Sequence, residues 1–164
     1  LKPSIGYLSL SLLDFDGNQI YAWQDSVIVA ANESRVYFTI DLRELSSEIN
    51  LNEVVLHGTF KGHSNRVLAE KNIYFVPPKD LLLANANLDY RLDVDETHYI
   101  LTITSNKFAK SVFVSSRSPL NFSDNYFDLL PGSSKTIRIP HNGNIELDNF
   151  KKSIEIRSLR DTYP

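Results

Sequence analysis

The sequence predicts an all-β protein built from two tandem immunoglobulin-like antiparallel β-sandwiches. Short runs in which apolar and polar residues alternate recur along the 164 residues, and this period of two is typical of half-buried strands. Helical periodicity is nearly absent. Turn-forming residues separate the runs about every eight to twelve residues, which is the spacing of antiparallel sandwiches. Two halves of roughly 80 residues each match the size of minimal immunoglobulin-like domains.

The first domain is predicted to begin with a β-hairpin. Leu8, Leu10 and Leu12 alternate with serines, and Asp16-Gly17 then gives a tight-turn signal. The strands expected after the turn are Gln19–Ala30, 36–40, Glu53–Phe60 and Arg66–Val76. In the second of these, Val36, Phe38 and Ile40 share one face and Tyr37 and Thr39 the other. One helical turn is expected within Leu42–Leu51.

A domain junction is predicted where the alternation stops, at Val76-Pro77-Pro78-Lys79-Asp80. Paired prolines donate no hydrogen bond to a ladder and favour an extended, semi-rigid chain. The predicted domains are therefore residues 1–78 and 79–164.

The second domain repeats the strand pattern. Leu88, Tyr90, Leu92 and Val94 share one face, and a polar turn follows. The further strands expected are His98–Ser105, Lys110–Ser116, Ser134–Pro140, 145–147 and Ser153–Ser158. Between the third and fourth strands, polar turn-formers lead into two aromatics, a Leu-Leu pair and Pro131-Gly132, which predicts a packed corner.

Composition excludes several classes of function. The net charge of −3 and the scattered basic residues offer no footprint for nucleic acid. No apolar stretch approaches the roughly 18–20 residues that span a membrane. Without cysteine there are no disulfides and no thiol chemistry, although this does not fix the compartment. Because the chain starts at Leu1 with no leader-like segment, we expect a fragment of a longer polypeptide.

Catalytic, cofactor and metal sites are not predicted. The four histidines are far apart in sequence and lack metal-ligand spacing. Asp14 and Asp16 echo a calcium loop, but a hairpin turn is the simpler account. The acidic residues Asp93, Asp95 and Glu96 are expected to form a solvated strand end, with a weak cation site as a remote alternative. No Gly-x-Ser-x-Gly elbow is present.

Three aromatic residues are candidates for an interface or a sugar contact: Trp23, Tyr21 and Tyr126. Trp23 and Tyr21 are in phase with apolar Val27, so buried packing is expected, with a sugar platform or a contact with a catalytic domain as the alternative. Tyr126 and Phe127 would point to opposite sides of an extended chain. One of them is therefore expected in the core and the other at the surface.

Two segments resemble the C-terminal part of the β-mannosidases of glycoside hydrolase family 2. Asn72–Leu81 is similar to the passage between their fourth and fifth domains, and Ser123–Gly132 is similar to a signature stretch of the fifth. Leu13–Asn18 resembles the hairpin that opens the preceding domain. Ser133 departs from the family, which often has Glu after Pro-Gly, and we draw no functional meaning from this change.

The resemblance implies a parent enzyme that is a retaining exo-glycosidase releasing terminal β-D-mannose. Its catalytic barrel would lie upstream, with two catalytic glutamates about 5 Å apart. Neither glutamate motif occurs here, since Asn52-Glu53 opens an ordinary strand and Asn32-Glu33 lies in a polar turn. The expected role is therefore a non-catalytic accessory fragment, inactive alone, that packs on and stabilises the barrel domain of the same parent chain.

Two alternatives remain open. In the first alternative, the chain is a carbohydrate-binding module within a glycosidase, with mannose-containing glycans as ligands. In the second, it is an adhesion-type sandwich unrelated to glycosidases. Related exo-acting glucosaminidases share the multi-domain plan, so the resemblance leaves the sugar specificity of the parent open.

Overall fold

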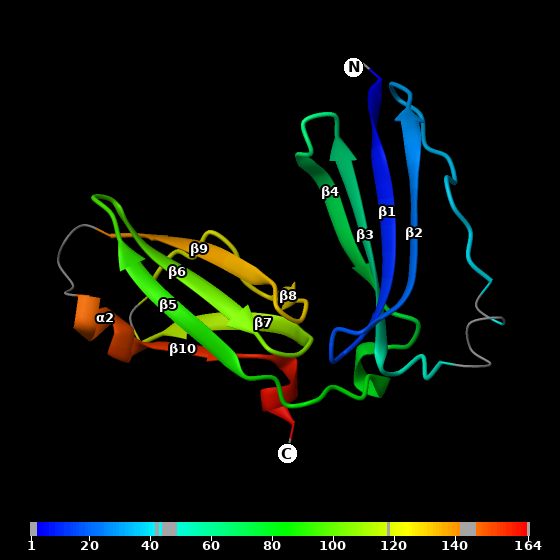
Figure 1. Cartoon of the computed structure of the whole chain (residues 1–164). Coiled ribbons are helices and arrows are strands. Elements are labelled where there is room, and N and C mark those ends of the chain that lie inside the picture. Colours follow the sequence, from blue (N-terminus) through cyan, green and yellow to red (C-terminus); the bar gives the residue numbers. More distant parts are fainter. Residues whose placement is uncertain (1–2, 42, 44–48, 118, 142–146, 164) are drawn as a thin grey trace. The chain divides into compact units, whose positions relative to one another are not determined.

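Residues 3–41, 43, 49–117, 119–141 and 147–163 are described by a computed structural model of the chain. The chain divides into two compact units. The first unit comprises Leu1–Asp14 and Asn18–Leu82, and the second comprises Phe15–Gly17 and Leu83–Pro164. Antiparallel strands form the sheets of both units (Figure 1), which confirms the predicted all-β class.

The described strands of the first unit form one sheet in the order β2-β1-β3-β4. These strands are β1 (Ser4–Asp14), β2 (Gln19–Val29), β3 (Val54–Gly62) and β4 (Val67–Ile73). The predicted hairpin is confirmed, because β1 pairs with β2 antiparallel and Gly17 takes the left-handed φ of +95° that a tight turn favours. Residues directly opposite each other on neighbouring strands project to the same side of the sheet. Leu10 is therefore on the same side as Trp23, and Leu12 on the same side as Leu56.

The strand predicted at 36–40 is wrong, because the chain there makes no ladder with the sheet. Side-chain contacts hold this segment instead. The Phe38 ring lies 4.4 Å from that of Trp23, and the Tyr37 hydroxyl and the Arg35 guanidinium both donate to the carbonyl of Ile28 on edge strand β2. Most of the helical turn predicted within Leu42–Leu51 lies outside the described residues.

The second unit has two three-stranded sheets, ordered β10-β7-β8 and β5-β6-β9. The strands are β5 (Leu88–Val94), β6 (His98–Ser105), β7 (Ala109–Ser116), β8 (Phe127–Leu129), β9 (Ser134–Pro140) and β10 (Ile154–Arg157). Two single turns of 3-10 helix are also described, η1 (Pro78–Asp80) in the first unit and η2 (Leu159–Thr162) in the second.

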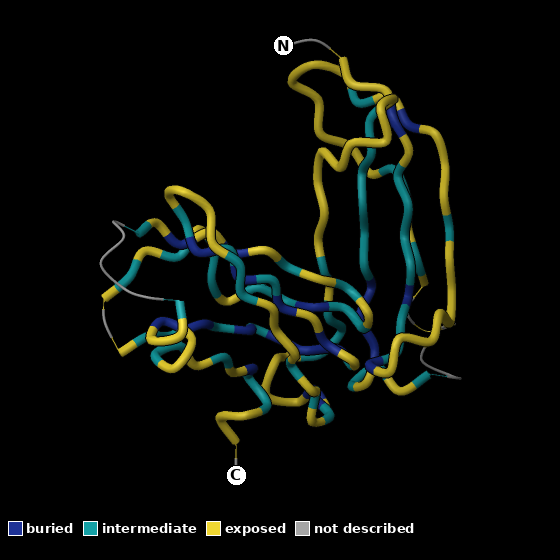
Figure 2. The backbone as a smooth tube through the Cα atoms, turned by 60° about the vertical axis from the view of Figure 1, so that its left-hand side comes forward, coloured by how far each residue is buried: buried dark blue, intermediate teal, exposed yellow. Residues whose placement is uncertain are grey.

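The larger hydrophobic core lies between the two sheets of the second unit. Its fully buried members come from both sheets and from one helix: Tyr99, Leu101, Ile103, Ala109, Val112, Val114, Leu129, Ile137, Ile139 and Phe150. The core of the first unit is smaller, with Leu12, Val54 and Leu56 at its centre. Figure 2 shows this difference, since most of the first unit's strands are intermediate or exposed along their length.

A helix, α2 (Leu147–Ser153), begins at the last residue of the strand predicted at 145–147, whose residues 145 and 146 lie outside the described part. Seven residues are too few for a helix that is stable alone. Tertiary packing supplies the missing stability, because buried Phe150 stacks on Tyr99 with ring centroids 4.0 Å apart. Asp148 in the first turn and Lys152 in the last complement the helix dipole.

The turn Phe15–Gly17 belongs to the second unit. Phe15 stacks on Phe108 at 4.9 Å between ring centroids, and its carbonyl accepts a hydrogen bond from the Phe108 N–H. Lys107 forms an ion pair with Asp16 at 2.6 Å. The contacts of Phe15 and Asp16 with Lys107 and Phe108 thus fix this three-residue turn within the second unit.

The predicted corner at Ser123–Gly132 contains short strand β8 and one unusual rung. Val112 pairs with Phe127, and two residues further along each strand the Asn125 side chain bonds to the N–H and the carbonyl of Val114, at 2.8 and 2.9 Å. The carboxamide thereby takes the place of a backbone neighbour. The corner ends at Gly132, with φ of +71°, whose N–H donates to the Ser105 carbonyl.

An apolar hollow as the candidate functional site

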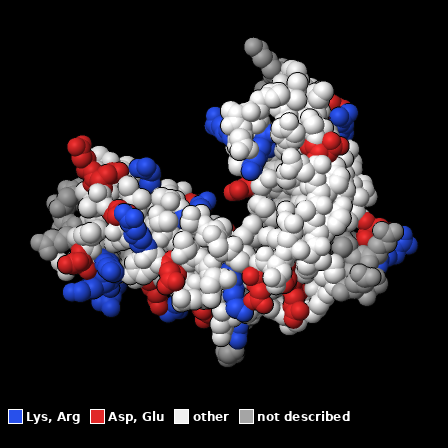
Figure 3. Space-filling view, in the orientation of Figure 1, with Lys and Arg blue, Asp and Glu red and all other residues white. Residues whose placement is uncertain are grey.

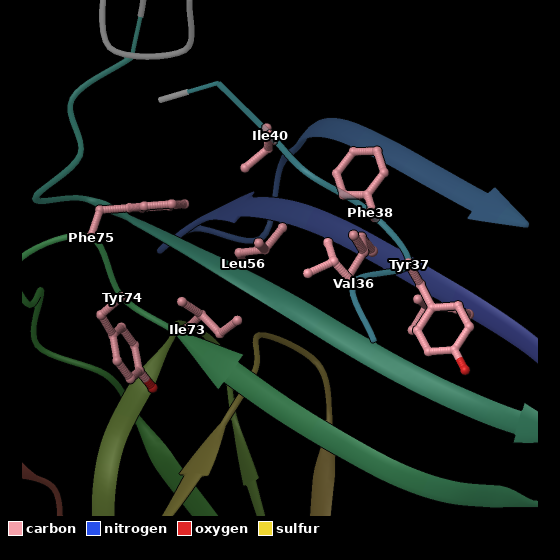
Figure 4. Close-up of a pocket in the computed structure, with 10 residues that line it drawn as sticks. Val36, Tyr37, Phe38, Ile40, Leu56, Ile73, Tyr74 and Phe75 are labelled. Atoms are coloured by element: carbon pink, nitrogen blue, oxygen red, sulfur yellow. The ribbon is translucent and has the colours of Figure 1, made fainter. Parts of the chain in front are cut away.

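The candidate site is a hollow of about 560 Å³ on the sheet of the first unit. Leu8, Leu10, Leu56, Ile73, Tyr74 and Phe75 line it from the sheet and the chain after it, and Val36, Tyr37, Phe38 and Ile40 line it from the crossing segment. We call this set of ten residues the apolar hollow. Figure 4 shows the crossing segment above the strands, with Leu56 on β3 between them.

Strand alternation explains why these side chains meet. Leu8 and Leu10 are two residues apart on β1, so they share a face of the sheet. Cross-strand pairing of Leu12 with Leu56, and of Leu56 with Ile73, brings the neighbouring strands to the same face. The sequence therefore builds an apolar surface across three strands.

The hollow has no group suited to proton transfer or metal binding. Its only polar side-chain atoms are the hydroxyls of Tyr37 and Tyr74, and the Tyr37 hydroxyl is already bonded to the Ile28 carbonyl. Ligand sites for sugars need several polar groups that fix hydroxyl positions. The chemistry of this hollow instead fits contact with another apolar surface.

Trp23 and Tyr21 lie on the face of the sheet that carries the hollow. Trp23 pairs with Leu10 and is half-buried beside Phe38, whereas Tyr21 pairs with Leu12 and is 36% exposed. The sequence predicts buried packing for both rings. Trp23 is half-buried against Phe38, whereas Tyr21 is exposed, so the predicted burial of Tyr21 is wrong. Their role as an interface or a sugar contact stays a prediction.

Tyr126 lies apart from these two residues in sequence, in the second unit, with 70% of its surface exposed. Phe127 packs against the core of the second unit, as expected for one member of this pair. The chain at Tyr126 is not extended, because φ is +60° there. The ring of Tyr126 stacks on Phe113, with centroids 5.6 Å apart.

Three carboxyl groups of the described residues have a shifted pKa, and in each case the shift is downward, which favours the anion. The Lys135 ammonium, with a 2.5 Å contact, lowers the pKa of Asp124, and the backbone N–H groups of Thr97 and His98 lower that of Asp95. The side chain of Arg43 lowers the pKa of Asp41. A general acid of a glycosidase needs the opposite shift, a raised carboxyl pKa.

Histidines and acidic clusters take part in local contacts. The His57 ring bonds to Asn72 at 2.8 Å, the His141 ring packs on Tyr99, and His98 contacts Thr97. Asp93, from the predicted acidic cluster, is paired with Arg91 at 2.8 Å. Within the described ranges, no group of three or more potential ligands is placed to hold a metal ion.

Charge is mixed over the face drawn in Figure 3, where acidic and basic side chains alternate and neither sign forms a continuous patch. Lys110 forms an ion pair with Asp128 at 3.6 Å, and both side chains are largely buried. Among the helices of the described chain, none is long and apolar enough to cross a membrane.

Sequence reasoning missed the lining supplied by the crossing segment. The alternation of Val36, Phe38 and Ile40 was the available signal, and it was interpreted as a strand. It also missed Phe113 and the Asn125 rung, for which the local sequence gave no signal beyond the unusual composition of the corner.

Two family models match the chain. Residues 1–80 match a mannosidase Ig/CBM-like domain, and residues 83–162 match the Ig-fold domain of the mannosidase type. No significant match was found among curated protein sequences.

Solved structures show the same fold in glycosidases. A β-D-mannosidase from Dictyoglomus thermophilum matches with a TM-score of 0.76 and 18% identity, over 97% of this chain and 19% of that one. An exo-chitosanase from Amycolatopsis orientalis matches with a TM-score of 0.54 and 13% identity, over 96% of this chain and 23% of that one. The chain thus spans about a fifth of the length of these enzymes. With both models matched in tandem, the predicted pair of immunoglobulin-like domains is confirmed, and the chain belongs to the mannosidase immunoglobulin-like domain families found in the C-terminal part of β-mannosidases.

Proposed function

We propose that the chain is a non-catalytic accessory part of a β-mannosidase-type glycosidase, which packs against the catalytic domain of the same polypeptide and stabilises it. The observation that carries the proposal is the apolar hollow, an accessible surface of Leu, Ile, Val and Phe side chains with two tyrosine hydroxyls as its only polar side-chain groups. Burying such a surface against another domain is favourable by about 25 cal/mol per Å² of apolar area.

The family context supports the choice of partner. In the Dictyoglomus β-D-mannosidase the matching region is 19% of the chain, so most of that enzyme lies outside it. None of the described carboxyl groups with a shifted pKa has the raised pKa of a general acid, since the pKa values of Asp41, Asp95 and Asp124 are all lowered.

The first test concerns activity. We expect the 164-residue chain to release no 4-nitrophenol from 4-nitrophenyl β-D-mannopyranoside, and a longer polypeptide that includes the reading frame upstream of Leu1 to release it. Hydrolysis by the chain alone, or an upstream reading frame that encodes no glycosidase, contradicts the proposal.

The second test concerns the hollow and uses matched variants of the longer polypeptide. Val36 lines the hollow and is 79% exposed, whereas Val67 on β4 is 45% exposed and lies outside the hollow. Val36→Asp should lower the thermal midpoint of the catalytic domain, because a charge would enter the interface. Val67→Asp should leave it unchanged. Equal effects of the two variants would rule out docking through the hollow.

A further inference from the structure

A pair of aromatic rings lies on the outer face of one sheet in the second unit. Val112 and Val114 on β7 point into the core, so Phe113 between them points outward. The Tyr126 ring stacks on Phe113 with an angle of 17° between the ring planes. The two rings form a platform, and Tyr126, at 70% exposure, is its accessible part.

The backbone of Tyr126 is strained in a way that fixes this platform. A φ of +60° is in the left-handed region, which is unfavourable for a bulky side chain. The neighbouring Asn125 holds it there, with its side chain bonded to the N–H and the carbonyl of Val114 and its Oδ1 accepting from the Tyr126 N–H. Strain maintained by such surroundings is concentrated at functional positions.

Polar groups border the platform on the side of β10. Phe113 pairs with Arg157, and the next outward pair is Ser115 with Glu155. Arg157 and Glu155 face outward, because Ile156 between them packs on the core, and the two form an ion pair at 2.5 Å. Arg157, Phe113 and Tyr126 thus form a row about 10 Å long, two strand spacings across the sheet.

A second, polar hollow adjoins the row. It has a volume of about 410 Å³, and its lining includes Glu155 together with Ser116, Arg117, Lys152, Ser153 and Ile154. This lining comes from the end of β7 and the residue after it, from the last residues of α2 and from the start of β10 (Figure 1), and Glu155 is the residue that it shares with the polar border of the platform.

We propose that this surface is a saccharide-binding subsite. The C–H groups on the less polar face of a pyranose carry partial positive charge, and the face of an aromatic ring is negative, so a sugar ring stacks on Tyr126. The Glu155 carboxylate and the Arg157 guanidinium lie at the other end of the row, where they offer an acceptor and donors to the hydroxyls of the next sugar of a β-linked oligosaccharide. That sugar would extend toward the polar hollow.

A protein partner is the less suitable occupant. Stable protein interfaces bury about 800 Å² on each side and have cores depleted of charge. Here the charged pair Arg157–Glu155 lies beside the rings, where a protein would have to desolvate it. The proposal concerns the second unit and does not depend on the accessory function proposed above.

Binding is tested by titrating the 164-residue chain with β-1,4-linked mannotriose, cellotriose and chitotriose and recording a two-dimensional NMR spectrum at each concentration. We expect saturable shifts with at least one trisaccharide, centred on Tyr126, Phe113 and Glu155. Tyr126→Asn removes the ring while keeping a residue that tolerates a left-handed backbone, so the variant should stay folded and bind about tenfold more weakly.

The matched control is Tyr90→Asn, which removes a 39%-exposed tyrosine on β5 of the other sheet and should leave affinity unchanged. Glu155→Gln should weaken binding several-fold, because it removes the charge of the acceptor. The proposal is overturned if no trisaccharide binds saturably, or if Tyr126→Asn and Tyr90→Asn bind equally well. Because no catalytic domain is present in this assay, its outcome is independent of the tests of the accessory function.

Discussion

The rung made by the Asn125 side chain allows a quantitative prediction about the corner. Asn125→Ala removes the hydrogen bonds to the N–H and the carbonyl of Val114, a residue that is 2% exposed, together with the longer, exposed bond from the Tyr126 N–H. Each bond contributes about 1 kcal/mol, and each backbone group left without a partner adds a desolvation cost, for a sum of about 2–4 kcal/mol. For a domain of this size that loss lowers the thermal midpoint by roughly 10–20 °C.

The assay is urea unfolding followed by circular dichroism, together with amide exchange at Val114. Asn125→Asp should not rescue stability, because it keeps the acceptor for the Val114 N–H but places a carboxylate oxygen against the Val114 carbonyl. Asn106→Ala is the matched control: Asn106 accepts one exposed bond from the Asn87 N–H, and its loss should cost less than about 1 kcal/mol. If Asn125→Ala costs no more than Asn106→Ala, the side chain does not act as a rung.

Three further predictions follow from single contacts. Phe150→Ala should destabilise the second unit by about 3–5 kcal/mol in urea unfolding, because a fully buried ring that stacks on Tyr99 is lost; a change below about 1 kcal/mol contradicts this packing. Phe38→Ala should shift the fluorescence emission of Trp23, the single tryptophan, to longer wavelength, because the indole loses the ring that shields it from water. An unchanged spectrum would show that the two rings are not in contact in solution. Lys135 lowers the pKa of Asp124 in the folded state, so this pair stabilises the fold above about pH 4 and ceases to do so as the pH falls through the lowered pKa. Asp124→Asn should therefore flatten the dependence of the unfolding free energy on acid pH, and an unaltered pH profile would contradict a stabilising role of this pair.

Much of the strand pattern could be predicted from local alternation. The runs at Leu88–Val94 and Ser134–Pro140 coincide with β5 and β9, and the Asp16-Gly17 turn joins β1 to β2. Alternation reports only that a chain is extended with one side buried. It therefore misassigned 36–40, where an extended segment is held by side chains and not by a ladder.

Features that depend on distant contacts were beyond prediction from sequence. The helix at Leu147–Ser153 is too short to have a strong periodic signal and forms because Phe150 meets Tyr99. Likewise, nothing near Phe15 in the sequence indicates that its ring stacks on Phe108. Tyr126 is one of the three aromatic residues that the sequence offers as candidates, but nothing in the sequence indicates that its ring stacks on Phe113.

The contacts at the Ile28 carbonyl have a consequence for self-association. An edge strand of 11 residues such as β2 is a template on which another chain can add a strand. Near its end the Ile28 carbonyl is already occupied by Tyr37 and Arg35, and the guanidinium lies over the Tyr37 ring at 4.7 Å. An incoming strand would have to break both bonds and the ring contact before it could pair there, which protects this end of the edge strand against the addition of another chain.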